Sequence, residues 1–162
     1  MIILGIDPGT GRLGWGIVDK SHGKETMIDY GCLETPAHTP LPERLEKIHQ
    51  FINEIISRHK PEVAAVEALF FATNAKTAIS VGAARGVVLL ACQQNHLPIF
   101  DYTPLQVKST LTGFGQADKK QVQFMVTKLL HLKETPQPDD AADALAIALT
   151  HSTHSKNVTM PS

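Results

Sequence analysis

Hydrophobic residues follow two different repeats along the chain. Over residues 2–7, 13–19 and 26–34, short apolar or alternating runs are bounded by turn-forming residues, a pattern that predicts strands. The connections at residues 8–11 and 21–23 are short and contain glycine with proline or serine. We therefore expect these three strands to form an antiparallel meander.

The rest of the chain alternates helical and strand patterns. From Pro42 to about Lys60, apolar residues recur at helical spacing. The further elements that we expect are a strand at 63–66 ending at Glu67, a helix at about 74–94, a strand at 99–102, and helices near 105–111, 119–130 and 140–151. This order predicts an α/β fold, a mixed sheet covered by helices on both faces. We expect one domain over 1–151 and a disordered polar tail over 152–162.

Composition limits the class of protein. A chain of 162 residues with 43% hydrophobic residues fits one globular domain with an ordinary core. Cys32 and Cys92 lie far apart, outside any metal-binding spacing, and are expected to be buried free thiols in a reducing compartment. The first residues lack the basic stretch of a signal peptide, and the apolar-leaning run at 86–100 is shorter than the roughly 20 residues of a spanning helix. These features predict a cytoplasmic protein outside the membrane.

Charge is segregated along the sequence. The net charge of −1 argues against nucleic-acid binding, but its distribution argues for it. Residues 103–133 hold five Lys against one Asp, an excess of four positive charges, whereas residues 134–143 hold four acids and no Lys or Arg. A basic surface beside an acidic pocket suits a polyanion and bound cations, and a solvated helix face is the open alternative.

Two carboxylates follow apolar strands. Asp7 ends the run 2–6 and Glu67 ends the run 63–66, where a charge is costly unless it is solvated or paired with a cation. Asp7 before Pro-Gly is also typical of a plain turn. If the two strands are neighbours, their ends lie roughly 5 Å apart, and both carboxylates share one edge of the sheet.

Two more acids begin the last predicted helix. Asp140 and Asp143 are three residues apart and project from one helical face, although like charges there repel. Asp139 or Asp140 alone is better explained as an N-cap, which the helix dipole favours, but capping does not explain Asp143. Four acids without Cys or a His cluster form an oxygen-ligand site that suits Mg²⁺ or Mn²⁺ rather than zinc. Two such cations about 4 Å apart hydrolyse phosphodiesters in proteins.

These residues belong to short blocks that together resemble the motifs of the RuvC family of Holliday junction resolvases. The blocks occur in the family order and cover the chain to about residue 151. They are Gly5-Ile6-Asp7-Pro8-Gly9-Thr10, Val66-Glu67 followed by Phe70, Ala84-Arg85-Gly86-Val87, Thr112-Gly113 through Lys119, Gln121-Val122, and Asp140-Ala141-Ala142-Asp143-Ala144-Leu145-Ala146.

The resemblance implies a ribonuclease H-like fold and a homodimer that makes paired, Mg²⁺-dependent nicks in four-way junction DNA, with RuvA and RuvB as partners. It also implies roles for named residues. The implied metal-binding catalytic acids are Asp7, Glu67, Asp140 and Asp143. The implied DNA-binding residues are Phe70, with its neighbour Phe71 as the alternative, Arg85, Lys108 and Lys119. The small residues Gly82, Ala83, Ala84 and Gly86 suggest the hypothesis that their helix forms the dimer contact.

The expected mechanism needs no covalent intermediate. Asp7 holds both metals with the other three acids, a metal-bound water attacks phosphorus in line, and Lys119 or Lys108 stabilises the phosphate charge. The rival functions are a junction-binding module without catalysis and a related nuclease that acts on RNA. An actin-like ATPase shares the Asp-x-Gly-Thr turn but needs roughly twice this length.

Overall fold

A computed structural model describes residues 1–68 and 75–155 of the chain. The strands are β1 (Ile2–Asp7), β2 (Arg12–Ser21), β3 (Lys24–Glu34), β4 (Val63–Glu67) and β5 (Ile99–Tyr102). The helices are α1 (Leu41–His59), α2 (Ala75–Gln94), α3 (Pro104–Thr112), α4 (Lys119–Leu129) and α5 (Asp139–His154). The expected strands and helices are confirmed with shifts of a few residues at their ends.

The strands form one mixed sheet in the order β3-β2-β1-β4-β5. β1, β2 and β3 are antiparallel neighbours, as expected, and a left-handed pair, His22 and Gly23, makes the tight turn between β2 and β3. β4 lies parallel to β1, with Ile6 opposite Val66. Since β4 also lies parallel to β5, the carboxyl ends of β1, β4 and β5 meet at one edge of the sheet.

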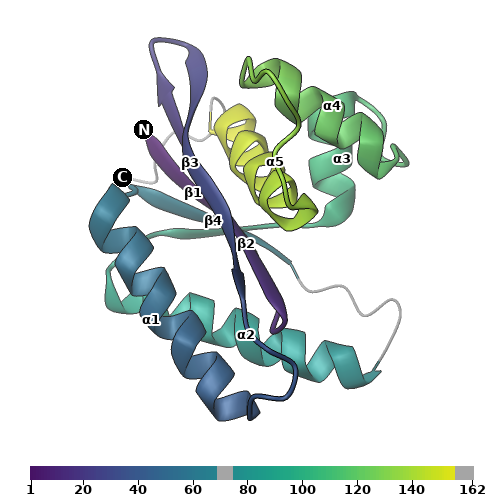
Figure 1. The fold of residues 1–162 in the computed structure, drawn as a ribbon. Coiled ribbons are helices and arrows are strands. Elements are labelled where there is room, and N and C mark those ends of the chain that lie inside the picture. Colours follow the sequence, from purple (N-terminus) through teal and green to yellow (C-terminus); the bar gives the residue numbers. More distant parts are fainter. Residues whose placement is uncertain (69–74, 156–162) are drawn as a thin grey trace.

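Helices cover both faces of this sheet, as Figure 1 shows. α1 and α2 pack on one face, where alternate side chains of β1 such as Leu4 and Ile6 join Ile48 and Ile52 of α1 in a buried core. α5 lies on the other face, where Ile3 of β1 joins a second core. α3 and α4 pack against α5, so the acidic start of α5 lies beside the two helices that carry the lysines.

Glycines let α5 lie unusually close to the sheet. A Cβ atom on Gly5 would lie 2.1 Å from the carbonyl oxygen of Ala144, and one on Gly14 would lie 1.9 Å from that of Asp140. Real Cβ contacts are never this short, so both positions require glycine. The alanines of α5 complete the close packing because they add no bulk beyond a methyl group.

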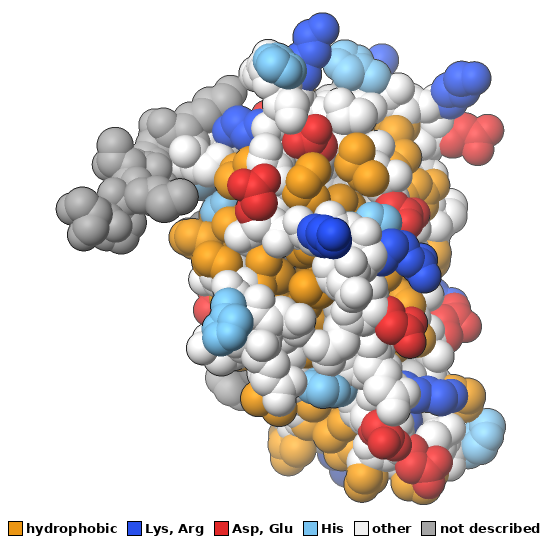
Figure 2. Space-filling model, turned by 90° about the vertical axis from the view of Figure 1, so that its left-hand side faces the viewer, with side chains coloured by type: hydrophobic (Ala, Val, Ile, Leu, Met, Phe, Trp, Pro, Cys, Tyr) orange, Lys and Arg blue, Asp and Glu red, His pale blue; other side chains and the backbone are white. Residues whose placement is uncertain are grey.

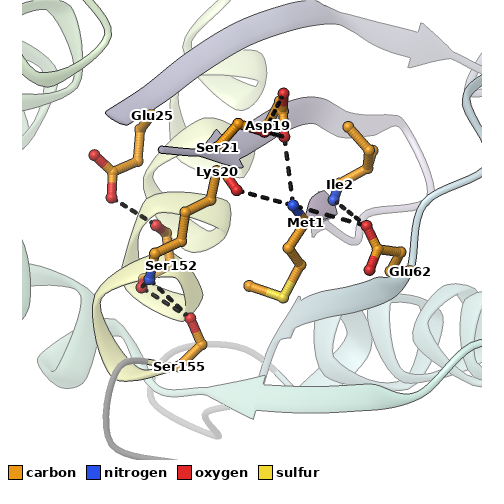
Figure 3. A network of polar contacts seen from close by, with 9 residues as sticks. All are labelled: Met1, Ile2, Asp19, Lys20, Ser21, Glu25, Glu62, Ser152 and Ser155. Atoms are coloured by element: carbon orange, nitrogen blue, oxygen red, sulfur yellow. Dashed lines mark hydrogen bonds and ion pairs between the residues drawn. The ribbon is translucent and has the colours of Figure 1, made fainter. Parts of the chain in front are cut away.

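The far end of α5 is tied to the hairpin of β2 and β3 (Figure 3). The Lys20 ammonium donates to the Ser152 carbonyl and to Ser155 Oγ, and Ser152 Oγ donates to Glu25 Oε1 at 2.8 Å. Nearby, the Met1 amine donates to the Lys20 carbonyl at 2.8 Å. Ser152 is fully buried and α5 continues to His154, so the expectation that the tail begins at residue 152 is wrong. Residues 156–162 of that tail lie outside the described residues.

Helix α2 begins at Ala75, before the apolar-leaning run at 86–100, and is 20 residues long. By length and composition alone it could cross a membrane, because its only charged residues are Lys76 and Arg85. Core helices of proteins outside membranes have the same composition.

Cys32 and Cys92 are both free, as expected, but Cys32 is only half-buried, because β3 lies at the edge of the sheet.

On the face shown in Figure 2, acidic, basic and hydrophobic side chains are mixed. The basic excess of residues 103–133 lies instead around α3 and α4, on the right in Figure 1.

Candidate active site

Asp7 and Glu67 meet at the carboxyl ends of β1 and β4. They follow the paired residues Ile6 and Val66, so the two strands are the neighbours that the sequence analysis required. Burial raises the pKa of both acids, and the side-chain hydrogen bond between them raises the pKa of Asp7 further while it lowers that of Glu67. Burial, the charges of Glu67, Asp143 and Asp140, and this bond raise the pKa of Asp7 to about 9. Three other carboxylates therefore act on Asp7 electrostatically.

Asp140 and Asp143 reach the same edge from the start of α5. The carboxylates that raise the pKa of Asp7 include Asp140 and Asp143, whereas Asp139 accepts from Gln123 Nε2 at 3.1 Å. The structure thus directs Asp140, rather than Asp139, toward Asp7. Neither acid is the N-cap, because that position belongs to Pro138 and α5 has no side-chain cap. The capping alternative for Asp139 or Asp140 is therefore wrong.

A lysine from α4 contacts the acids of α5. Lys119 Nζ lies 3.3 Å from Oδ2 of Asp143 and 3.3 Å from Oδ2 of Asp139. Burial would lower the pKa of Lys119, but the carboxylates of Asp143 and Asp139 outweigh it and raise this pKa. The capping box of Asp118 and Gln121 fixes the start of α4, and thereby the position from which Lys119 reaches across.

A cavity of about 270 Å³ opens between α3, α4 and α5 beside these acids. Three carboxylates, Glu67, Asp118 and Asp143, and two lysines, Lys108 and Lys119, line it together with apolar side chains. Of the predicted acids, Glu67 and Asp143 line this cavity together with Lys108 and Lys119, whereas Asp7 and Asp140 are linked to them through the electrostatic interactions of Asp7. A negatively charged group entering it would meet both lysines beside the acids.

A residue that the sequence analysis missed, Arg12, closes the other side of the site. Its guanidinium lies 3.7 Å from Asp140 Oδ2 and 3.1 Å from Glu34 Oε1. Arg12 faces Glu34 across the β2–β3 ladder, a pairing that register predicts, but its contact with Asp140 depends on how α5 packs on β2. No local sequence signal could have identified that contact.

The acids of the site can be tested for their fit to a divalent cation by their chemistry and by the side chains that they contact now. Within residues 1–68 and 75–155, no three Asp, Glu, His or Cys side chains stand ready to enclose an ion, and Arg12 and Lys119 pair with Asp140 and Asp143. Yet burial and the neighbouring carboxylates raise the pKa of Asp7, as expected of an acidic cluster that lacks a compensating positive charge. Carboxylate oxygens are the ligands that Mg²⁺ and Mn²⁺ prefer, so the chemistry of the donor set suits such an ion.

Arg85, which was predicted to bind DNA, does not line the cavity in the described part of the structure. Arg85 Nη2 lies 2.5 Å from Asp101 Oδ1, and its Nε donates to the Glu67 carbonyl at 3.2 Å. The Arg85 side chain is only 16% exposed, and its observed role is to hold the end of β4 through the hydrogen bond to the Glu67 carbonyl. Phe70 and Phe71 lie outside the described residues.

Comparison with known proteins places this arrangement in a family. Residues 3–151 match the family model "Crossover junction endodeoxyribonuclease RuvC". The enzyme of that name from Desulfitobacterium hafniense is 55% identical over 158 residues, which are 98% of this chain and 95% of that protein. The structure of Thermus thermophilus RuvC superposes with a TM-score of 0.88 at 41% identity over 96% of each chain. A structure of T. thermophilus RuvC in complex with a Holliday junction substrate matches with the same TM-score at 38% identity over 96% of each chain.

Proposed function

The chain belongs to the RuvC family of crossover junction endodeoxyribonucleases, and we infer from this that it is an endonuclease that resolves Holliday junctions. Its fold is the ribonuclease H-like fold of that family. The observation that carries the inference is the convergence of Asp7, Glu67 and Asp143 from three separate elements at the edge of one cavity. Such a cluster has no structural purpose, because it destabilises the fold by mutual repulsion.

We propose that Asp7, Glu67, Asp140 and Asp143 hold two Mg²⁺ ions, or Mn²⁺ in their place. Bound there, the ions would supply an activated water and neutralise the scissile phosphate. The acids on β1 and β4 sit on the rigid centre of the sheet, and those on α5 are fixed by its close packing on Gly14. Asp7 holds its proton in the ion-free protein and must release it to become a ligand.

The lysines of the cavity act on the phosphate. Lys119 contacts Asp143 in the ion-free protein, and an ion bound by Asp143 would free its ammonium to face the phosphate. Lys108 lines the same cavity from α3. Both are compact positive charges that stabilise a phosphate whose charge grows in the transition state.

Replacing Lys119 with Ala is expected to slow junction cutting about a hundredfold, a loss of about 2.7 kcal/mol of transition-state stabilisation. The side chain is 52% exposed, so the variant should keep its fold. Single-turnover nicking under saturating enzyme measures the effect, with Lys47→Gln on α1 as the matched lysine control. An unchanged cutting rate would remove Lys119 from the mechanism.

The function itself is tested with a panel of substrates. The protein is incubated with a synthetic four-way junction, a linear duplex and an RNA–DNA hybrid, each with and without Mg²⁺. Two symmetric nicks in the junction alone, with the metal present, are the expected products. Binding without nicks would support the silent junction-binding module, and cleavage of the hybrid would support the RNA nuclease.

We propose that the active form is a homodimer formed through α2. Ile79 and Leu90 of α2 are 75% and 52% exposed, and the small residues Gly82, Ala83 and Gly86 lie between them at helical spacing. A stripe of this kind lets two helices approach closely, and two active sites are needed for paired nicks.

Replacing Leu90 with Glu is expected to convert the dimer into a monomer at micromolar concentration, because a charge would be buried in the contact. Light scattering after size exclusion should give twice 17.6 kDa for the wild type and 17.6 kDa for the variant. Ile28→Glu on β3, which replaces a side chain that is 50% exposed, is the matched control. A wild-type protein of monomeric mass would contradict the proposal.

Further expectations rest on the family resemblance. We propose that Phe70 contacts bases at the opened junction, that Arg85 supports DNA binding by bracing Glu67, and that RuvA and RuvB are partners. We also propose a cytoplasmic location, where the DNA substrate lies and where two unpaired thiols remain reduced.

A further inference from the structure

The outer side of α4 carries an exposed aromatic ring next to lysines. Phe124 is 58% exposed, and it lines a hollow of about 380 Å³ on the surface. We call this hollow the α4 groove, and its lining residues are Thr112, Asp118, Lys120, Gln121, Phe124 and Met125. A second exposed ring, Phe114, lies in the loop that leads from α3 to α4. Single exposed apolar residues are ordinary, but a ring that lines a hollow beside lysines is a recognisable ligand surface.

Helix geometry explains why Phe124 faces outward. Val122 and Val126 are buried against the core, and Phe124 lies two residues from each, about 200° around the helix. Lys128 follows one turn later, and its Nζ lies 5.5 Å from the centre of the Phe124 ring. The ring and the ammonium are therefore held together on the solvent side of α4.

The α4 groove adjoins the active-site cavity at the start of α4. Asp118 lines both the groove and the active-site cavity. Lys119 and Lys120 adjoin it and diverge, since Lys119 lines the cavity and Lys120 lines the groove. Within the described part of the chain, Lys120 has no ion-pair partner. A strand of nucleic acid leaving the cavity across the start of α4 would pass from one lysine to the next.

We propose that the α4 groove binds the DNA strand next to the cleaved phosphate, with one unpaired base stacked on Phe124 and the backbone phosphates at Lys120 and Lys128. This inference rests on the proposed function and names a further contact for the same substrate. The groove offers an aromatic surface beside positive charge, a combination that suits an unpaired base on an anionic backbone. Paired bases in a duplex are already stacked, so the ring favours a strand opened near the branch point.

The groove is tested by binding of the full chain to a synthetic four-way junction in EDTA, where no cutting occurs. Phe124→Ala should weaken binding about tenfold, while Phe124→Trp should retain it, because stacking of one base contributes on that scale. Lys120→Gln and Lys128→Gln should each reduce the slope of log affinity against log salt by about 1. Ile28→Ala and Lys47→Gln are the matched controls and should change neither quantity.

A fluorescent base analogue identifies the stacked position directly. With 2-aminopurine placed in turn on either side of the cleaved phosphate, one position should be quenched by the wild type and not by Phe124→Ala. Equal affinities, salt slopes and quenching in the wild type and variants would overturn the inference. So would an acidic, Phe-containing peptide that binds more tightly than the junction and loses its affinity in Phe124→Ala, since the groove would then serve a protein partner.

Failure of the inference can be told apart from failure of the proposed function. If the wild type nicks the junction in Mg²⁺ but the groove variants bind and cut normally, only the inference fails. If the wild type does not nick the junction, the proposed function fails, and the binding measurements still decide whether the groove contacts DNA.

Discussion

Replacing Asp7 with Asn is expected to slow junction cutting by roughly a thousandfold, about 4 kcal/mol, while junction binding stays close to that of the wild type. Asp7 lies at the centre of the acidic cluster, where Glu67, Asp143 and Asp140 all act on it. The amide has the same shape but cannot serve as an anionic ligand, so the loss should fall on chemistry rather than on binding. Nicking rates in Mg²⁺ and affinities in EDTA separate the two.

The same substitution should stabilise the ion-free protein, and more so at higher pH. Burial and neighbouring carboxylates raise the pKa of Asp7 to about 9 in the folded state, whereas in the unfolded chain it ionises near its ordinary value of 3.8. The folded protein therefore binds more protons between these values, and the stability from protonated Asp7 is lost as pH rises toward 9. Asn cannot ionise, so its variant keeps that stability.

At pH 7.5 in EDTA, we expect Asp7→Asn to raise the free energy of unfolding by about 2 kcal/mol. This is less than the roughly 5 kcal/mol that the full shift from 3.8 to about 9 corresponds to at this pH, because water and neighbouring groups rearrange around an ionised Asp7. The corresponding rise in melting temperature is roughly 4–8 °C. It should grow between pH 5 and pH 9, as followed by circular dichroism. Glu46→Gln, which removes an exposed acid of α1, is the control and should show no such trend. Normal nicking by Asp7→Asn would disprove its role as a ligand, and a pH-independent difference would disprove its neutral state.

The second large effect is expected from Gly14→Ala. The new Cβ would lie 1.9 Å from the carbonyl oxygen of Asp140, so β2 or the start of α5 must move. Both neighbours are backbone in packed elements, and neither can rotate away. We expect a loss of about 3 kcal/mol or more in the free energy of unfolding, together with a loss of cutting beyond what the unfolded fraction explains, because Asp140 and Asp143 move with α5.

Gly11→Ala provides the matched control. Gly11 lies three residues before Gly14, in the connection between β1 and β2, and a Cβ there would lie 3.6 Å from the Arg44 guanidinium, which is ordinary contact. Its melting temperature and nicking rate should stay near those of the wild type. A stable and fully active Gly14→Ala protein would show that α5 is not held by this close approach.

The sequence predicted some features of the site and left others open. The strands ending at Asp7 and Glu67 were evident from their apolar runs, and their adjacency is confirmed by the parallel pairing of β1 with β4. The choice between Asp139 and Asp140 was open, because both begin the same helix. In the structure, Asp140 and not Asp139 is among the carboxylates that raise the pKa of Asp7, which supports our proposal that Asp140 is the ligand.

Some contacts had no signal in the sequence at all. Arg12 reaches Asp140 only because β2 lies under the start of α5, and Arg85 reaches the Glu67 carbonyl only because α2 crosses the end of β4. The extension of α5 to His154 was also missed, because a polar segment was expected to be a tail. Its order comes from Lys20 and Glu25, which lie more than a hundred residues away and contact Ser152.

By itself, the sequence determined the elements, the mixed sheet and the acids that end apolar strands, because these depend on the hydrophobic repeat, on turn residues and on the energetic penalty for a buried charge. The motif order added the resemblance to the RuvC family. Only the tertiary structure decided which carboxylates face one another, which cations pair with them and where the α4 groove opens. Those distances depend on how α4 and α5 rotate and pack on the sheet, and no interaction between neighbours in the sequence encodes that packing.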